Sequence, residues 1–515
     1  MVETVYTVYT VPGSGRWRDN RGVTEFELKL EVPPERPHAL AAVLRQGEAH
    51  RERLRATYFD TADGALAADG IVVRMRQEGR KWVQTAKAPG RGSVERLEHN
   101  VPVAAPAARM TPAVDLARHT GTPLGDAIRR ALGLKAQAPY PPLAALYETD
   151  VTRLAVTVQR GESQVEVALD EGRICAGERS LPVRELELEL KHGHPGDVVQ
   201  LAREGCRTHG LWLSVISKSM KGQRLAGTPG SGGKGAKAPA YGSHAGGHEL
   251  VCAVVSACLD QVLWFASEVA GGSTDTEHIH QLRVGIRRLR TALRELAGLS
   301  DGLDPAWEGP LVEVFRALGK HRDQHHLARS VEPQVEAAGG PAVDAAALAA
   351  EVPDPAAAVR SPAFQDTLLA LLGFVHRDSG NNGSGPGKAG KQVRKALDRL
   401  HAQVLRDGRR FASLEETLQH RVRKRAKRLR YLAEFAAPLF GARKTQGFTD
   451  RLKPLQDALG QYNDELMALR VYTKLAPQQP KAWFAAGWLA GRREHNALAC
   501  QRAIEDFGRV RPHWK

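Results

Sequence analysis

The feature that most constrains the fold is a short stretch in which leucine alternates with glutamate. It runs Val183-Arg184-Glu185-Leu186-Glu187-Leu188-Glu189-Leu190-Lys191. Because successive side chains of a strand point to opposite faces, the leucines lie on one face and the glutamates on the other. Carboxylates two residues apart are about 6.6 Å from each other, so they repel unless cations lie against them. Taken alone, the stretch is equally typical of the solvated outer face of an antiparallel sheet.

A second acidic stretch of the same kind lies far away in the sequence. Glu25-Phe26-Glu27-Leu28-Lys29-Leu30 has the same alternation near the start of the chain. Two acidic strands that can pair in space favour a site for a divalent cation over a solvated face that simply carries charged side chains. A cation between the strands would relieve the repulsion between their carboxylates.

Composition limits the class of protein and of partner. The chain has 515 residues, which predicts two or three domains, and its 42% hydrophobic and 25% charged residues are typical of a soluble globular protein. A net charge of +15 predicts a large anionic partner, while 6% aromatic residues count against base stacking on single-stranded nucleic acid.

Cysteine usage and hydropathy bear on location. The five cysteines are scattered without metal-binding spacing, which favours a reduced cytoplasm. The N-terminus has no basic segment followed by an apolar one, so no signal peptide is expected. The most apolar window, 250–270, is interrupted by Asp260 and Glu268 and predicts a core helix rather than a membrane span.

Changes in pattern along the chain predict the domain organisation. We expect an N-terminal extension at 1–22, an α+β domain at 23–226 and a Gly/Ser-rich linker at 227–247. An all-α domain should occupy 248–515, divided by a low-complexity run at 379–391. Within the α+β domain, strand patterns occur at 25–32, 57–60, 71–77, 81–86, 95–103, 149–159, 164–170 and 184–191.

The helical half contains an internal repeat, over about 248–378 and 392–515. His280-x-x-Arg283-x-x-x-Arg287-x-x-Arg290 recurs as His420-x-x-Arg423-x-x-x-Lys427-x-x-Arg430, 140 residues later. Leu318-Gly319-Lys320-His321-Arg322-Asp323 is echoed 141 residues later by Leu459-Gly460-Gln461-Tyr462-Asn463-Asp464, and we expect this second motif to be mainly structural. Two motifs with nearly the same offset predict a duplicated helical bundle.

Charged residues also share one face of other predicted strands. Arg74 lies on the same face as Arg76, and Arg96 on the same face as Glu98. If the sheet closes into a barrel, these polar faces line a tunnel and the leucines lie outside, under helices. Carboxylates in such a tunnel suit Mg²⁺ or Mn²⁺, and arginine and lysine suit the oxygens of a polyphosphate.

These strands resemble the CYTH family, the triphosphate tunnel metalloenzymes. The resemblance rests on Glu25-x-Glu27-x-Lys29, Tyr58-Phe59-Asp60-Thr61, Val73-Arg74-Met75-Arg76, Trp82-x-x-Thr85-x-Lys87, Glu166-Val167-Ala168-Leu169-Asp170, the Glu-Leu repeat and Ser217-Lys218. It implies an eight-stranded antiparallel tunnel that binds a triphosphate and hydrolyses a terminal phosphoanhydride with Mg²⁺ or Mn²⁺.

The resemblance also implies roles for particular residues. Glu25, Glu27 and Lys29 would be catalytic, with Lys29 positioning or deprotonating water. The metal would be held by Glu25, Glu27, Asp170 and two of Glu185, Glu187 and Glu189, and the sequence leaves open which two. The phosphates would be clamped by Arg74, Arg76, Lys87, Arg96, Arg153 and Lys218.

The helical repeat resembles the CHAD family, the conserved histidine α-helical domain. In each copy the histidine and three cations fall on one helical face, because steps of three, seven and ten residues stay within about 80°. The resemblance implies two pseudo-symmetric four-helix bundles with a basic channel for inorganic polyphosphate. The residues implied are His280, Arg283, Arg287, Arg288, Arg290, His420, Arg423, Lys424, Lys427 and Arg430.

The sequence therefore predicts a metal-dependent inorganic triphosphatase with a polyphosphate-binding helical domain. The alternatives are a non-catalytic module for polyphosphate or RNA, or a tunnel acting on thiamine triphosphate or ATP; nucleotide cyclisation is a further reaction that the tunnel would allow. We expect a cytoplasmic protein, with association with polyphosphate granules as an option, no membrane contact and no obligate protein partner.

Overall fold

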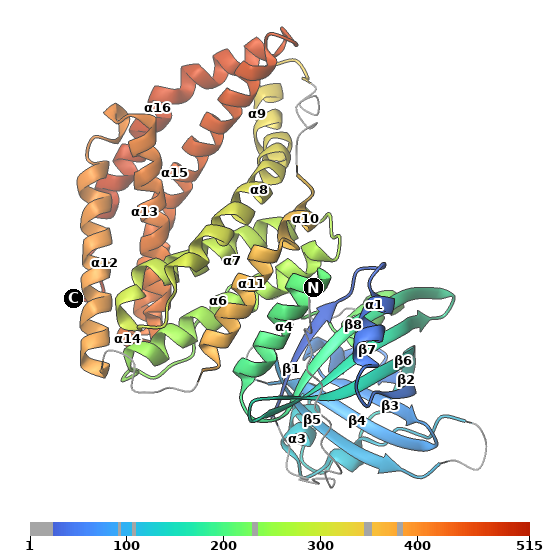
Figure 1. Cartoon of the computed structure of the whole chain (residues 1–515). Helices are drawn as coiled ribbons and strands as arrows, with labels where there is room; N and C mark the ends of the chain where they lie inside the picture. The colour runs from blue at the N-terminus through green and yellow to red at the C-terminus, as the bar shows by residue number, and fades with distance from the viewer. Residues whose placement is uncertain (1–23, 91–93, 106–109, 229–234, 344–352, 378–384) are drawn as a thin grey trace. The chain divides into compact units, whose positions relative to one another are not determined.

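The computed structural model describes residues 24–90, 94–105, 110–228, 235–343, 353–377 and 385–515 (Figure 1). The chain divides into two compact units. The first contains the described residues up to Gly235, together with Leu263–Gly271 and Arg360–Arg377; the second contains Ala236–Val262, Gly272–Val359 and Asp378–Lys515. The predicted extension at 1–22 and part of each low-complexity run lie outside the described residues, and the predicted domain limits stay predictions.

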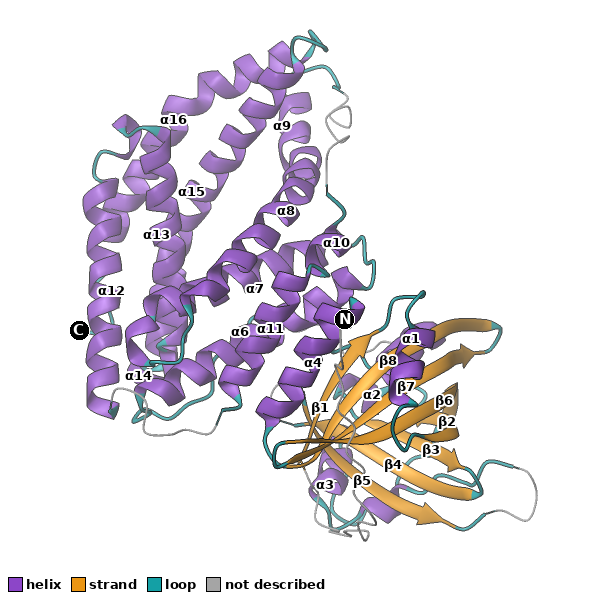
Figure 2. Ribbon diagram, viewed as in Figure 1, coloured by secondary structure: helices purple, strands orange, loops and turns teal. Residues whose placement is uncertain are grey.

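Eight antiparallel strands form a closed barrel in the first unit (Figure 2). They are β1 (Thr24–Glu31), β2 (His50–Asp60), β3 (Val72–Glu78), β4 (Lys81–Pro89), β5 (Glu95–Val103), β6 (Ala144–Arg160), β7 (Ser163–Ala176) and β8 (Arg179–His192). Their order is β5-β4-β3-β2-β6-β7-β8-β1, and a pairing of β1 with β5 closes the ring. A short β9 (Trp212–Leu213) adds to β1. The predicted α+β class and the eight-stranded antiparallel barrel are confirmed.

The alternation of β1 and β8 decides which way each strand faces. Leu28, Leu30, Leu186 and Leu188 are at most 1% exposed and lie on the outside, where helix α4 (Pro195–His209) covers both strands. The glutamates of the same strands therefore turn toward the barrel axis. The other helices and turns around the barrel are α1 (Pro37–Leu44), α2 (Ala65–Ala68), α3 (Pro123–Ala131) and η1 (Leu116–His119).

Helix α5 (Lys218–Ala226) packs against the inner face of the barrel. Gly222 permits this approach, because a Cβ atom there would lie 2.2 Å from the ring of Tyr147. Around the helix, inward side chains such as Val183 pack with Leu225 and Ala226 in an apolar cluster. The end of the barrel near the β7–β8 turn is therefore filled, and the polar interior lies beyond it.

The rest of the chain is helical, as predicted. Its helices are α6 (Gly247–Ala270), α7 (Thr276–Glu295), α8 (Glu308–His326), α9 (Glu332–Ala337), α10 (Pro355–Val359), α11 (Pro362–Val375), α12 (Pro386–Gly408), α13 (Glu416–Phe435), α14 (Ala437–Phe440), α15 (Ala442–Leu475) and α16 (Ala482–Gly508). Shorter turns are η2 (Ala297–Leu299), η3 (Pro305–Trp307), η4 (Leu327–Val331) and η6 (Phe411–Ser413). Helices α7 and α13 are both 20 residues long and start 140 residues apart, which is the offset of the sequence repeat.

Helices α6 and α11 both include residues of the compact unit that contains the barrel. Among the described helices, only α6 is long and apolar enough to cross a membrane by length and composition, and 67% of its apolar window is buried within the protein. A helix that is mostly covered by other parts of the chain behaves as a core helix, as the sequence predicted. Helix α11 lies alongside α4 and belongs to the compact unit of the barrel (Figure 1).

Candidate active site

The barrel interior contains a cavity of about 330 Å³, to which every one of the eight strands contributes. Its volume lies within the range of small-molecule sites, roughly 300–1,000 Å³. Among the described residues, eight cations line it: Lys29, Arg74, Arg76, Lys87, Arg96, Arg153, Lys191 and Lys218. Six acids line it as well: Glu27, Glu98, Glu166, Asp170, Glu187 and Glu189. All six predicted phosphate-binding residues therefore reach one cavity.

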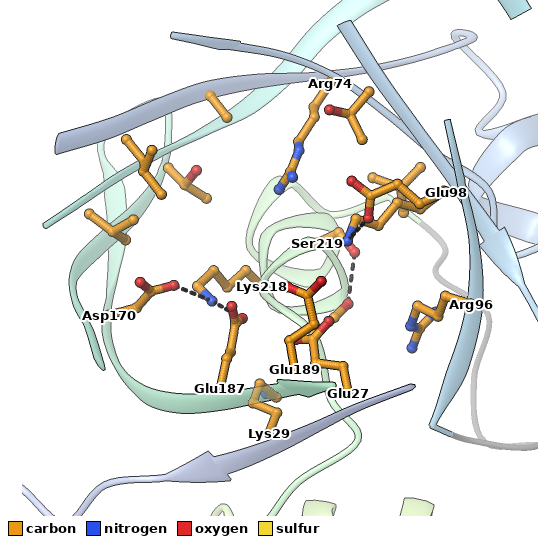
Figure 3. A pocket seen from close by; sticks show the side chains of 18 of the residues that line it. Glu27, Lys29, Arg74, Arg96, Glu98, Asp170, Glu187, Glu189, Lys218 and Ser219 are labelled. Atoms are coloured by element: carbon orange, nitrogen blue, oxygen red, sulfur yellow. Dashed lines mark hydrogen bonds and ion pairs between the residues drawn. The ribbon is translucent and has the colours of Figure 1, made fainter. Parts of the chain in front are cut away.

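Strand register brings three of the acids into a row. Glu27 of β1 is paired with Glu189 of β8, which is paired with Glu166 of β7. The side chains of Glu27 and Glu189 lie next to each other in Figure 3. Burial raises the pKa of Glu27, and the nearby carboxylate of Glu187 raises this pKa further. Glu27 is thus a carboxylate whose negative charge is poorly compensated by the protein alone.

Glu185 occupies a different environment from the two glutamates that follow it. It is fully buried, is absent from the cavity lining, and forms ion pairs with Lys29 at 3.2 Å, Lys218 at 2.8 Å and Lys221 at 2.7 Å. Burial alone would raise the pKa of Glu185, but these lysines hold it far below its ordinary value. Of the three glutamates that the sequence left open, Glu187 and Glu189 face the cavity.

Lys218 and Arg153 neutralise the acids at the base of the cavity. The ammonium of Lys218 lies 2.9 Å from Asp170, 2.8 Å from Glu185 and 2.6 Å from Glu187. The guanidinium of Arg153 donates two hydrogen bonds of 2.7 Å to Asp170 and a third to Glu187. Although burial would raise the pKa of Glu187, Lys218 and Arg153 keep it well below the usual range.

The remaining predicted phosphate-binding residues lie on β3, β4 and β5. Lys87 pairs with Glu98, whose pKa falls to about 2 because the attraction of Lys87 and Arg74 outweighs burial. Arg76 pairs with Glu78, and Arg96 is partly buried near Glu27. The Nε–H groups of Arg74 and Arg76 are buried and donate to no acceptor within the described residues. These donors remain available to an anion in the cavity.

Lys29 was predicted to position or deprotonate water. In the structure its ammonium donates hydrogen bonds to acceptors of the protein. It is 9% exposed and donates to Glu31 and Glu185, each at 3.2 Å, and to the backbone carbonyl of Ile216. These contacts join β1 and β8 to the loop that precedes α5. The side chain of its predicted partner Glu25 lies outside the described residues.

The predicted metal ligands are not clustered closely enough to form a metal-binding site within the described residues. Among the described residues, no three acidic, histidine or cysteine side chains stand close enough together to hold a metal ion. The donor chemistry is nevertheless that of a hard divalent cation, since Glu27 and Glu189 offer only carboxylate oxygens. The repulsion that raises the pKa of Glu27 is what such a cation would relieve.

The sequence reasoning missed some residues of the site. Lys221 follows Lys218 by one helical turn and contacts Glu31 and Glu185, each at 2.7 Å. Its position three residues after Lys218 on a helix was the signal that could have identified it. Asp60, which belongs to one of the recognised motifs, does not line the cavity. Its carboxylate accepts hydrogen bonds from backbone N–H groups at the start of α2.

Several predicted polyphosphate-binding cations of the helical region have partners inside the fold. Arg288 is 5% exposed, pairs with Glu434 of α13 and lies over the rings of Tyr431 and Phe435. Arg283 donates to the carbonyl of Phe315 at 2.7 Å. Further contacts are made by Arg287 with the Phe315 ring, Arg290 with Glu308, and Arg430 with Glu434.

A cluster of cations lies where α7, α8 and α13 meet. The side chain of Lys424 is exposed, and its pKa is lowered by partial desolvation and then by Arg290 and Arg294 of α7, Arg428 of α13 and Arg316 of α8. His420 hydrogen-bonds the side chain of Asn463 at 3.3 Å, and its pKa is lowered by burial and by Lys424, Arg423 and Lys427. His280, like Arg423 and Lys427, is partly buried on the same helices. The side chains of Arg322 and Asp323 lie outside the described residues.

Comparison with known proteins confirms both family resemblances. Residues 24–220 match the family model of the CYTH domain, and residues 253–472 match that of the CHAD domain. An inorganic triphosphatase of Haemophilus influenzae is 31% identical over 214 residues, which are 40% of this chain and only 56% of that protein. An uncharacterized protein of Mycobacterium tuberculosis is 28% identical over 462 residues, 83% of each chain. The crystal structure of the CHAD domain from the plant Ricinus communis is 28% identical, covers 55% of this chain and 98% of its own, and has a TM-score of 0.45.

Proposed function

Because the chain belongs to the CYTH family in its barrel and to the CHAD family in its helical region, we propose that the barrel hydrolyses inorganic triphosphate with a divalent metal ion. The observation that supports this most directly is the division of the cavity. Five of the six lining acids lie on β1, β7 and β8, whereas Arg74, Arg76 and Lys87 stand on β3 and β4, with Glu98 of β5 paired to Lys87. One wall suits a cation, and the other suits phosphate oxygens.

The charge balance supports a metal in addition to the substrate. The eight cations exceed the six acids by only two, which is less than the negative charge of a condensed phosphate. Glu27, Glu187 and Glu189, together with Glu25 as the sequence predicts, would hold Mg²⁺ or Mn²⁺. When bound, the ion polarises the phosphoryl group and lowers the pKa of a coordinated water.

The protein's own part in the reaction is positioning and charge stabilisation. Phosphoryl transfer needs little covalent chemistry from side chains, so fixed donors around the phosphates provide most of the catalysis. Arg74 and Arg76 have unused buried Nε donors, and Arg96 lies beside Glu27 between the two walls. We assign these three arginines to the phosphate oxygens, and Lys29 to holding the acidic strands together rather than to proton abstraction.

The test is phosphate release from tripolyphosphate, thiamine triphosphate, ATP and long-chain polyphosphate, each with and without Mg²⁺ or Mn²⁺. We expect the highest kcat/KM for tripolyphosphate, and no release without metal. A preference for ATP or thiamine triphosphate would instead assign the cavity to an organic triphosphate. Formation of a cyclic nucleotide without phosphate release would overturn hydrolysis altogether.

For the helical region we propose binding of inorganic polyphosphate as a second function. The observation in its favour is the cluster around Lys424, an exposed lysine whose pKa is lowered by partial desolvation and then by the arginines that lie near it on three helices. Such a cluster costs free energy that a bound polyanion recovers. Helix α13 places Lys424 next to Arg428, while α7 and α8 supply the other arginines.

Binding of polyphosphate and of RNA by the full chain at matched salt tests this second function. We expect polyphosphate to bind more tightly, and Lys424→Gln to weaken it and to lower the salt slope by about one unit for each lost phosphate contact. Lys395→Gln, an exposed lysine of α12, is the matched control. Tighter binding of RNA, or equal effects of the two substitutions, would contradict the proposal.

A further inference from the structure

Helix α5 is preceded by the loop 211–217. On one side, this loop is bonded to strand β1 of the barrel. Ser214 donates its N–H to the carbonyl of Lys29 at 2.9 Å, and β9 pairs with the end of β1. Ser217 then caps the helix, and Lys218, its first residue, points into the cavity (Figure 3). Any shift of residues 211–217 therefore moves the ammonium of Lys218 relative to Asp170 and Glu187.

The other side of this loop is held by two segments that lie far downstream in the sequence. The N–H of Leu213 donates to Oε1 of Gln365 at 2.8 Å, and the N–H of Val215 donates to Oγ of Ser267 at 3.0 Å. Gln365 is 1% exposed and Ser267 is 5% exposed, so water cannot replace either acceptor. Both segments belong to the same compact unit as the barrel.

The far end of α5 is held in the same way. Arg224 of α5 forms an ion pair with Glu268, with Nη1 and Oε2 at 2.9 Å, and Glu268 is 7% exposed. The loop is also covered from outside, because the guanidinium of Arg360 lies 4.1 Å from the ring centroid of Trp212 and donates to the carbonyl of Ala270 at 2.8 Å. Side chains of α6 and α11 thus fix both ends of α5.

We propose that Gln365, Ser267 and Glu268 are positioning residues of the barrel reaction, which they serve by holding α5 so that Lys218 keeps its place among the acids at the base of the cavity. They lie at 267, 268 and 365, inside the region 253–472 that matches the CHAD domain. The helical region consequently supplies part of the catalytic framework of the barrel, in addition to any anion that it binds. This inference rests on the proposed triphosphatase function.

The experiment compares Gln365→Met with Thr367→Val in the full-length protein. Both residues are buried on α11, but among the described residues the hydroxyl of Thr367 donates to the carbonyl of Ala363 in its own helix and to no part of the loop before α5. For Gln365→Met we expect a kcat for tripolyphosphate that is lower by about tenfold to a hundredfold, the scale of a small misplacement of a catalytic group. Thr367→Val should retain the wild-type kcat, and the melting temperatures of the two variants should be similar.

Hydrogen exchange of the peptide 212–226 gives a readout that does not depend on activity. It should speed up in Gln365→Met and stay as in the wild type in Thr367→Val. Faster exchange with an unchanged kcat would overturn the positioning role, and unchanged exchange would show that Gln365 does not hold the loop. If the wild type releases no phosphate, the proposed function fails, whereas the exchange comparison still decides whether α11 fixes α5.

Discussion

Replacing Glu27 by alanine should abolish metal-dependent phosphate release from tripolyphosphate, with a loss of kcat of at least about a thousandfold. The physical reason is that the pKa of Glu27 is raised by burial and by the nearby carboxylate of Glu187, which a bound cation would counteract. Loss of a metal that stabilises several kcal/mol of developing charge corresponds to roughly three orders of magnitude in rate. The measurement is phosphate release at saturating tripolyphosphate over a range of Mg²⁺ concentrations.

A matched control separates this effect from the loss of one negative charge elsewhere on the barrel. Glu171 lies on β7, is partly buried and is paired with Arg184 on the outer face of the barrel, so Glu171→Ala should keep wild-type turnover. Direct binding of Mn²⁺ should weaken in Glu27→Ala and not in Glu171→Ala. Unchanged turnover of Glu27→Ala would remove the metal assignment from β1.

Replacing Lys218 by methionine should reduce both catalysis and stability. Its ammonium neutralises Asp170, Glu185 and Glu187, and the side chain is only 12% exposed. Removing one partner of a buried ion pair leaves an uncompensated charge, which costs about 3–5 kcal/mol of unfolding free energy. Chemical denaturation at neutral pH measures the loss, and Lys81→Met, an exposed lysine of β4, should cost almost nothing.

The stability loss of Lys218→Met should depend on pH in a defined direction. In the wild type, burial opposes ionisation, but the lysines and Arg153 hold the pKa values of Glu185 and Glu187 below the ordinary 4.5. The stability contributed by these pairs is present above that value and disappears as the pH falls through the folded-state values. The difference between variant and wild type should therefore be largest near neutral pH and shrink on acidification. A pH-independent difference would show that Lys218 acts through packing instead of charge.

Local patterns were sufficient for much of the barrel. The leucine–glutamate alternation correctly predicted the inward acids and the outward leucines, because strand periodicity depends only on neighbouring residues. The face shared by Arg74 and Arg76 was predicted for the same reason. The acidic residue that leaves the cavity lining, Glu185, could not be distinguished from Glu187 and Glu189, since its burial depends on lysines from β1 and α5.

Other features depend on contacts between distant parts of the chain. The pairing of Glu25 with Arg96 that closes the barrel joins segments about 70 residues apart, and no local signal encodes it. Strand β9 has only two residues, which are too few for a strand pattern to be recognised. The bond from Leu213 to Gln365 spans 152 residues, so the role of α11 beside the barrel emerged only from the structure.

The helix that fills one end of the barrel has a consequence for the kind of substrate that would fit the proposed function. A channel open at both ends would let a long chain thread through and be cut anywhere along its length. Here α5, packed through Gly222 against Tyr147, fills the end of the barrel near the β7–β8 turn, so under the proposed function we expect the terminus of a chain, rather than its middle, to enter the cavity. Degradation of long polyphosphate would then shorten each molecule from its tip, and a cyclic phosphate, having no tip, would be a poor fit.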